Sequence, residues 1–193
     1  MKKRILFFCF VSQSLSAQVS TFQSEFDQIN ENLMVGLGSY ALSNFAMSGA
    51  GYVLSDDKTA QRFHEMNVMW NTVNFGLALP GYLKAKKGSK ELTLEEMIQK
   101  QKKTETIFLM NDILDVGYIA LGFWMRNESK NRPDRSEMFK GYGNSLILQG
   151  SFLLVFDAYA YFLHRNHGKG LMEMDRVSLN LRANGIGLLV DLD

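Results

Sequence analysis

Cysteine is almost absent from this sequence, and the single residue, Cys9, lies close to the start of the chain. A basic start and the apolar run from Ile5 to Val11 are typical of a secretory signal peptide, with cleavage close to Ala17. We therefore predict a signal peptide over residues 1–17, after which the mature chain has no cysteine. Disulfides, thiolate metal sites and cysteine nucleophiles are then excluded. An N-terminal anchor that stays attached is the alternative.

Strong net charge and catalytic motifs are also missing. The formal charge of +1 over 193 residues gives no general attraction to nucleic acid, so we expect no nucleic-acid partner. Glu65 is followed by no histidine at the spacing of a zinc hydrolase, and neither a phosphate loop nor a nucleophile elbow occurs. The chain is therefore not expected to be an enzyme.

Long runs with few or no charged residues alternate with charged links. Four such runs are long enough to cross a bilayer, and they cover residues 33–54, 66–83, 107–125 and 141–163. Because short links make neighbouring helices antiparallel, the pattern predicts an all-α membrane protein. Its domain would be an antiparallel four-helix transmembrane bundle over residues 18–170.

The C-terminal tail has a different pattern. Val177, Leu179 and Leu181 alternate with polar residues, and Asn184-Gly185 then precedes a second alternating run. An Asn-Gly pair between alternating runs is a strong β-hairpin signal. We predict a short hairpin over residues 171–193, docked on the bundle or on a partner, because a lone hairpin is marginal in water.

Two aspartates, Asp112 and Asp115, interrupt the third apolar run. A carboxylate near the middle of a membrane helix costs about 2.5–3.5 kcal/mol on insertion scales, so it usually faces a partner or a wet cavity. At about 1.5 Å per residue, both lie at the depth of Asp157 in the fourth run. The predicted binding cluster in and above this layer comprises Asp112, Asp115, Asp157, Asn74, Tyr161 and His164.

Three interpretations of this cluster remain open. Its carboxylate, amide and imidazole groups could hold a hard or borderline divalent cation. The carboxyl groups could instead share protons, because two neighbouring negative charges repel each other. Alternatively, the aspartates are merely hydrated, or paired with nearby lysine, histidine and tyrosine side chains.

A ladder of asparagines follows one face of the second run. Asn67, Asn71 and Asn74 recur at intervals of four and three residues, and amides at this spacing commonly hydrogen-bond between helices. Toward the opposite end of the bundle we predict a second polar cluster, which comprises His64, Glu65, Asn67, Asn71 and Asn144.

The link from Lys84 to Lys103 is rich in lysine. Thr93 and Glu96 have the spacing of a capping box, so a helix is expected to start there and run into the third apolar run. Such a basic stretch with one apolar side either lies on anionic lipid or forms a solvated extension of the helix.

Two topology signals disagree. A cleaved signal peptide places the mature N-terminus outside, and the lysine-rich link and the C-terminus would then lie outside as well. Lysines on that side break the positive-inside rule. We give the signal peptide more weight and predict a multi-pass protein of the bacterial inner membrane with both termini in the periplasm. A retained signal, or a soluble bundle, would change the compartment.

A short internal similarity links the two halves of the chain. Residues 37–42 resemble residues 116–121, and the surroundings of residues 64–73 resemble those of residues 136–146. Either the chain contains two similar αα-hairpins, or apolar helices resemble each other here by chance.

The stretches NLMVGLGSYALSNFAMSGAGY and FHEMNVMWNTVNFGLALPGYLKAKK resemble a family of small, signal-bearing bacterial membrane proteins of unknown function. The resemblance covers most of the mature chain. It implies a four-span membrane domain and supplies no activity, so it assigns no functional residues.

These patterns predict a small integral membrane protein of the bacterial envelope that acts as a structural or interaction component without catalysis. The lipid bilayer is the expected partner. A protein partner or a second copy of the chain is a further candidate. The alternative is a cation- or proton-binding transport module that uses the intramembrane aspartates. A membrane-embedded enzyme with a carboxylate and histidine site ranks third. No cofactor is identified beyond the divalent cation considered above.

Overall fold

The computed structural model describes residues 2–88 and 90–183, with side chains described from residue 16 to residue 176. The described chain is helical except for its short links. Its elements are α1 (Lys2–Leu54), α2 (Lys58–Lys87), α3 (Leu94–Glu128), the short 3₁₀ helix η1 (Pro133–Arg135) and α4 (Ser136–Ala183). Each of the four predicted apolar runs lies inside one of the four long helices.

Local sequence explains where α2 and α3 begin and end. The side chain of Asp57 accepts hydrogen bonds from the backbone N–H groups of the first turn of α2. Gly88 ends that helix with φ of 72°, a conformation that glycine adopts without steric cost. At the start of α3, the side chains of Thr93 and Glu96 each accept a hydrogen bond from the other's backbone N–H. The predicted capping box is therefore confirmed.

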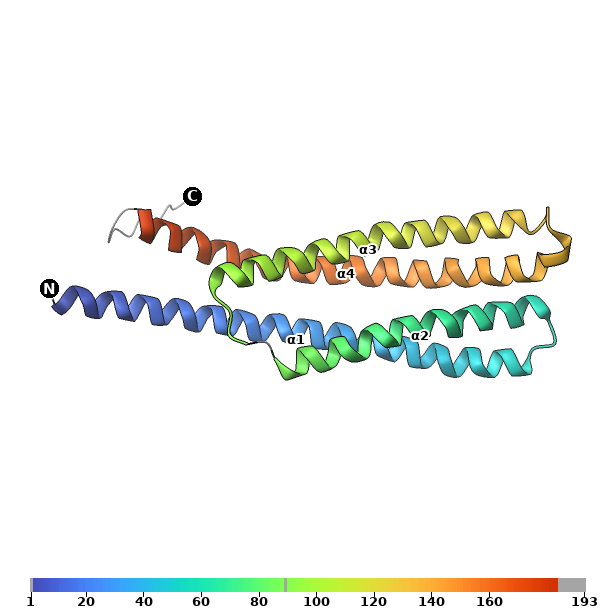
Figure 1. Cartoon of the computed structure of the whole chain (residues 1–193), viewed down its shortest axis with the longest axis horizontal. Coiled ribbons are helices and arrows are strands. Elements are labelled where there is room, and N and C mark those ends of the chain that lie inside the picture. The colour runs from blue at the N-terminus through green and yellow to red at the C-terminus, as the bar shows by residue number, and fades with distance from the viewer. Residues whose placement is uncertain (1, 89, 184–193) are drawn as a thin grey trace.

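The four helices form two αα-hairpins, α1 with α2 and α3 with α4 (Figure 1). Both hairpin turns lie at one end of the molecule. The start of α1 and the end of α4 lie toward the other end, and the α2–α3 link lies between that end and the middle of the molecule. The hairpins contact each other mainly through α2 and α4. The predicted antiparallel order of neighbouring helices is thus observed.

α3 and α4 approach each other closely at glycines. A Cβ atom added at Gly122 would lie 2.7 Å from the carbonyl oxygen of Gly143, and one added at Gly143 would lie 2.7 Å from that of Gly122. Small residues at such crossings let two helix backbones touch. This contact fixes the register of the second hairpin.

The structure contradicts the predicted C-terminal hairpin over the residues that it describes. Residues 171–183 continue α4, and no strand occurs in the described ranges. Leu171 is completely buried in a cluster with Phe26 and Met97, so helix packing anchors this end. Once a helix is nucleated, extending it by one residue costs little. The Asn184-Gly185 pair lies outside the described residues.

By length and composition, two segments could cross a membrane, namely α3 and Pro133–Arg176, which contains most of α4. Along the bundle the usual distribution of side chains is partly inverted, because many large apolar side chains are exposed on all four helices while many polar side chains are buried. We call this surface the apolar belt; it includes Val35, Leu42, Met47, Val53, Met69, Val73, Leu77, Leu83, Ile107, Ile113, Leu114, Phe123, Trp124, Leu148, Val155 and Phe162.

Candidate functional site

Two buried aspartates meet inside the bundle. Asp115 on α3 and Asp157 on α4 expose only 3% and 5% of their surfaces, and their carboxyl groups lie within hydrogen-bonding reach of each other. The side-chain amide of Asn111 donates a hydrogen bond of 3.5 Å to Asp157. Among the described donors, none bonds Oδ2 of Asp115. A hydrogen bond between two carboxyl groups requires a proton between them, so this pair can hold one.

Helical spacing explains why these residues face each other. On α3, Gln101, Phe108, Asp115 and Gly122 are buried at seven-residue intervals, which is two helical turns. On α4, Asp157 lies on the buried face that also carries the residues four, eight and twelve positions before it. The two faces form one seam, and the polar residues lie within it.

A cavity of about 180 Å³ adjoins the aspartate pair and is lined by residues of all four helices. Beside the two aspartates, the polar side chains of its wall are those of Asn74, Asn111, Trp70 and Tyr118, and the other lining residues are apolar. The Trp70 and Tyr118 rings meet edge to face at 4.7 Å. This volume accommodates several water molecules beside the carboxyl groups.

A second polar network lies further along the bundle. The side-chain oxygen of Asn67 accepts hydrogen bonds from Ser145 at 2.7 Å and from Gln149 at 2.9 Å. Tyr40 donates to the side-chain oxygen of Gln149 at 3.2 Å, and Asn71 donates to the backbone of Asn67 at 2.8 Å. The network therefore ties α1, α2 and α4 together. This geometry favours interhelical hydrogen bonding as the role of the asparagine ladder.

The structure divides the first predicted cluster. Asp115, Asp157 and Asn74 line the same cavity, whereas Asp112 is half-buried and does not line it. The other two predicted members, Tyr161 and His164 on α4, lie away from this cavity.

Tyr161 packs against the cluster around Leu33 and Phe108. His164 is completely buried, stacked on Phe108 at 5.6 Å and tilted against Phe26 at 4.9 Å. It lies about two helical turns from Asp157, so the structure does not bring the imidazole to the carboxyl pair.

The second predicted cluster is also divided. Asn67 and Asn71 belong to the network, but Asn144 is half-buried outside it. Glu65 forms an ion pair of 2.7 Å with Arg62 near the surface. His64 fills the space beside Gly51, where an added Cβ atom would collide with the imidazole ring.

Several residues of these sites were not predicted: Tyr40, Trp70, Asn111, Tyr118, Ser145 and Gln149. Helical spacing could have found two of them, because Asn111 and Tyr118 lie one turn before and after Asp115. Helical spacing within one helix does not predict which side chains of different helices contact each other.

The described residues contain no group of three or more His, Cys, Asp and Glu side chains arranged to hold a metal ion. Asp115 and Asp157 supply two close carboxyl groups, with amides as their neighbours. The observed geometry therefore resembles a proton-sharing pair more than a cation site.

Comparison with known proteins gives a family and no activity. A family model described as a family of unknown function (DUF6992) matches residues 36–158. No curated protein and no solved structure matches the chain. The matched range contains Asp115, Asp157 and the whole Asn67 network, and it confirms the expected membership of a family without known function. The chain belongs to the DUF6992 family.

Proposed function

We propose that this chain is a small integral membrane protein of the bacterial envelope, and that it acts as a structural or interaction component with all four helices in the bilayer. The observation that carries the proposal is the inverted distribution of side chains. The apolar belt faces outward, while Asn67, Asn71, Gln149, Asp115 and Asp157 are buried. A soluble monomer rarely exposes contiguous apolar patches beyond a few hundred Å², so a lipid environment accounts for the belt.

The belt also covers α1 and α2, which are not among the two candidate membrane spans. α2 carries Asn67, Asn71 and Asn74 on its buried face, and these amides lower its average hydropathy. Its outward face carries Met69 and Val73, both exposed. An amide that is buried against other helices costs far less in a membrane than one that faces lipid. Average hydropathy therefore underestimates the suitability of α2 for the bilayer.

A helical extension supports the interaction role. α2 ends at Lys87, and beyond it α1, α3 and α4 continue together around their own apolar core. That core contains Val19, Phe22, Met97 and Leu171. Because it lies beyond the apolar belt, the extension would project from the membrane and offer a surface to a partner or a second copy.

Membrane fractionation tests the proposal. The full chain should stay in the membrane pellet after alkaline carbonate extraction and should enter solution only with detergent. Recovery in the carbonate supernatant would contradict membrane embedding.

A second candidate function, proton binding within the membrane, is favoured by one observation: the Asp115–Asp157 pair borders a cavity large enough for water. In proteoliposomes under a pH gradient, this function predicts proton flux through the wild-type protein. Replacing Asp157 by Asn should abolish that flux and leave helicity unchanged. Equal flux in the wild type, the variant and protein-free vesicles would exclude a transport role.

A further inference from the structure

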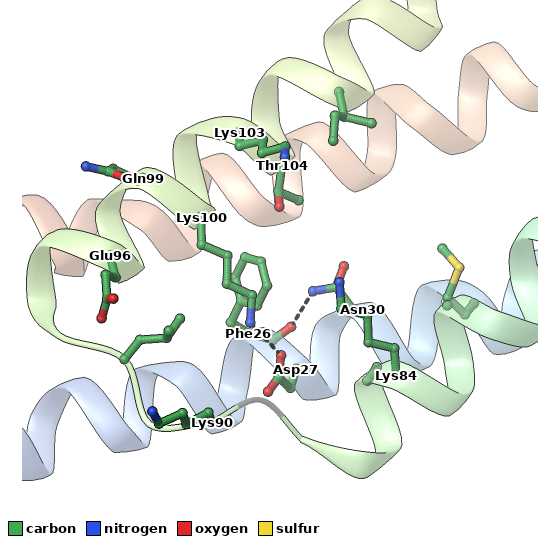
Figure 2. Close-up of a pocket in the computed structure, with 15 residues that line it drawn as sticks. Phe26, Asp27, Asn30, Lys84, Lys90, Glu96, Gln99, Lys100, Lys103 and Thr104 are labelled. Carbon is green, nitrogen blue, oxygen red and sulfur yellow. Dashed lines mark hydrogen bonds and ion pairs between the residues drawn. The ribbon is translucent and has the colours of Figure 1, made fainter.

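The lysine-rich end of the bundle contains a larger cavity, of about 650 Å³ (Figure 2). It opens between α1, the end of α2, the α2–α3 link and the start of α3. One part of its wall is apolar, with Phe26, Met34, Leu92 and Ile107. The polar residues of the wall include four lysines, which are Lys84, Lys90, Lys100 and Lys103.

The cavity has an excess of positive charge. Its two acidic side chains, Asp27 and Glu96, already have partners. Asp27 forms an ion pair of 3.0 Å with Lys100, which also lies over the Phe26 ring (Figure 2). Glu96 accepts hydrogen bonds of 2.8 and 2.9 Å from the backbone and hydroxyl of Thr93.

Two of the remaining lysines, Lys84 and Lys103, are available to a ligand, whereas Lys90 lies near enough to Glu96 to help lower the pKa of its carboxyl group. Within the described part of the chain, Lys84, Lys90 and Lys103 form no ion pair with an acidic residue. Lysines that line one cavity and form no ion pair are suited to an anion, and phosphate is a common one for lysine.

The depth of the cavity matches the headgroup region of a bilayer. Lys84 directly follows Leu83, an exposed residue of the apolar belt. Lys103 lies one turn, about 6 Å, before Ile107, another belt residue. The lysines therefore lie at the edge of the belt, and the apolar wall formed by Met34 and Ile107 leads from them toward it.

We propose that this cavity binds an anionic phospholipid. The ammonium groups of Lys84 and Lys103 donate to its phosphate, and an acyl chain lies against Met34 and Ile107. The proposal rests on the proposed membrane embedding. A free phosphate would satisfy the lysines alone, whereas the apolar wall and its depth favour a lipid. Basic pockets between membrane helices commonly bind such headgroups.

Native mass spectrometry of the full chain in detergent tests this proposal with phosphatidylglycerol and with zwitterionic phosphatidylcholine. The wild type should retain one phosphatidylglycerol and much less phosphatidylcholine. The variant Lys84→Gln/Lys103→Gln should bind phosphatidylglycerol about tenfold more weakly or worse, since each lysine near a lipid surface contributes measurably. The variant Lys84→Arg/Lys103→Arg should keep the binding.

The matched control is Lys87→Gln/Lys102→Gln, which removes the same charge from the same two helices. Neither of these lysines lines the cavity, so phosphatidylglycerol binding should stay within about twofold of the wild type, as expected for charges outside the site. Circular dichroism should show equal helicity in all variants. Equal losses in the control and the cavity variant would overturn the specific site in favour of general surface charge.

Two further probes separate lipid from free phosphate. Inorganic phosphate and glycerol 3-phosphate carry the anion without an acyl chain, so millimolar amounts should not displace phosphatidylglycerol. Displacement by either would overturn the lipid assignment. Carbonate extraction tests embedding separately. An embedded protein that does not prefer phosphatidylglycerol would therefore refute the lipid site and leave the proposed function standing.

Discussion

Asp115 and Asp157 face each other across the α3–α4 seam, with their carboxyl groups within hydrogen-bonding reach. Both belong to helices that also carry the exposed apolar belt, and both are nearly inaccessible to solvent. A buried carboxyl pair is tolerated when a proton neutralises one of the two charges and a hydrogen-bond donor stabilises the other. The amide of Asn111 supplies one such donor to Asp157.

The hypothesis that Asp115 and Asp157 share a proton predicts an infrared signature. Wild-type protein should show the carbonyl band of a protonated carboxyl group that shifts in D₂O. In Asp115→Asn, the new amide can donate to Asp157 without an additional proton, so the band should disappear while helicity is preserved. In Asp112→Asn, which changes a half-buried aspartate outside the cavity lining, the band should persist. An unchanged band in Asp115→Asn would refute the shared proton.

The Asn67 network predicts an energetic coupling between α2 and α4. Asn67→Leu leaves Ser145 and Gln149 without their shared acceptor, so the free energy of unfolding in detergent should fall by about 1–2 kcal/mol. A double-mutant cycle with Ser145→Ala should give a coupling of about 0.6–1.7 kcal/mol. Thr72→Ala is the control, because Thr72 is exposed and bonds only within its own helix. A coupling near zero would show that the bond does not contribute.

The glycine crossing of α3 and α4 predicts opposite effects for two similar substitutions. Gly122→Ala places a methyl group against the backbone of Gly143, and overpacking of this kind costs about 1–3 kcal/mol. Gly117→Ala meets nothing within 4 Å and should stabilise α3 by up to about 1 kcal/mol through helix propensity. Chemical unfolding of both variants tests the difference. Equal effects would contradict the close contact.

The capping box at the start of α3 predicts a pH dependence. Hydrogen bonds from Thr93 lower the pKa of Glu96 below its ordinary value. A lowered pKa means that the stabilisation is present above the pKa of the unfolded state and is lost as the pH falls through the folded-state pKa.

The start of α3 should therefore fray in acid, and NMR titration should report the lowered pKa of Glu96. Thr93→Ala should cost about 1 kcal/mol at neutral pH and should return the pKa of Glu96 toward its ordinary value. Glu95→Gln, next to the box but outside it, should leave that pKa lowered. A normal pKa in the wild type would contradict the capping geometry.

The helices could be predicted from the sequence because each apolar run is long enough to cross a bilayer, and the capping box of Thr93 with Glu96 marks the start of α3. The first strand of the C-terminal hairpin was predicted wrongly because three alternating residues, Val177, Leu179 and Leu181, are by themselves a weak signal. The helix that Leu171 anchors overrides them.

Depth matching suggested Asp157 as the neighbour of the α3 aspartates, since depth follows from residue count alone. Rotation of each helix about its axis does not follow from it, because the packing of all four helices determines that rotation. His164 was therefore expected near the aspartates, whereas it lies between Phe26 and Phe108. The lysine cavity likewise depends on how the α2–α3 link folds over α1.

Cysteine accessibility in membrane vesicles tests most directly whether all four helices lie in the bilayer. In a Cys9→Ser background, Leu42→Cys on α1 and Val73→Cys on α2 place thiols on the exposed belt, and Lys130→Cys marks the turn between α3 and α4. Four-helix embedding predicts that a membrane-impermeant maleimide labels residue 130 in vesicles that expose that side and leaves residues 42 and 73 unlabelled until detergent is added. Rapid labelling of residues 42 and 73 in intact vesicles would contradict it.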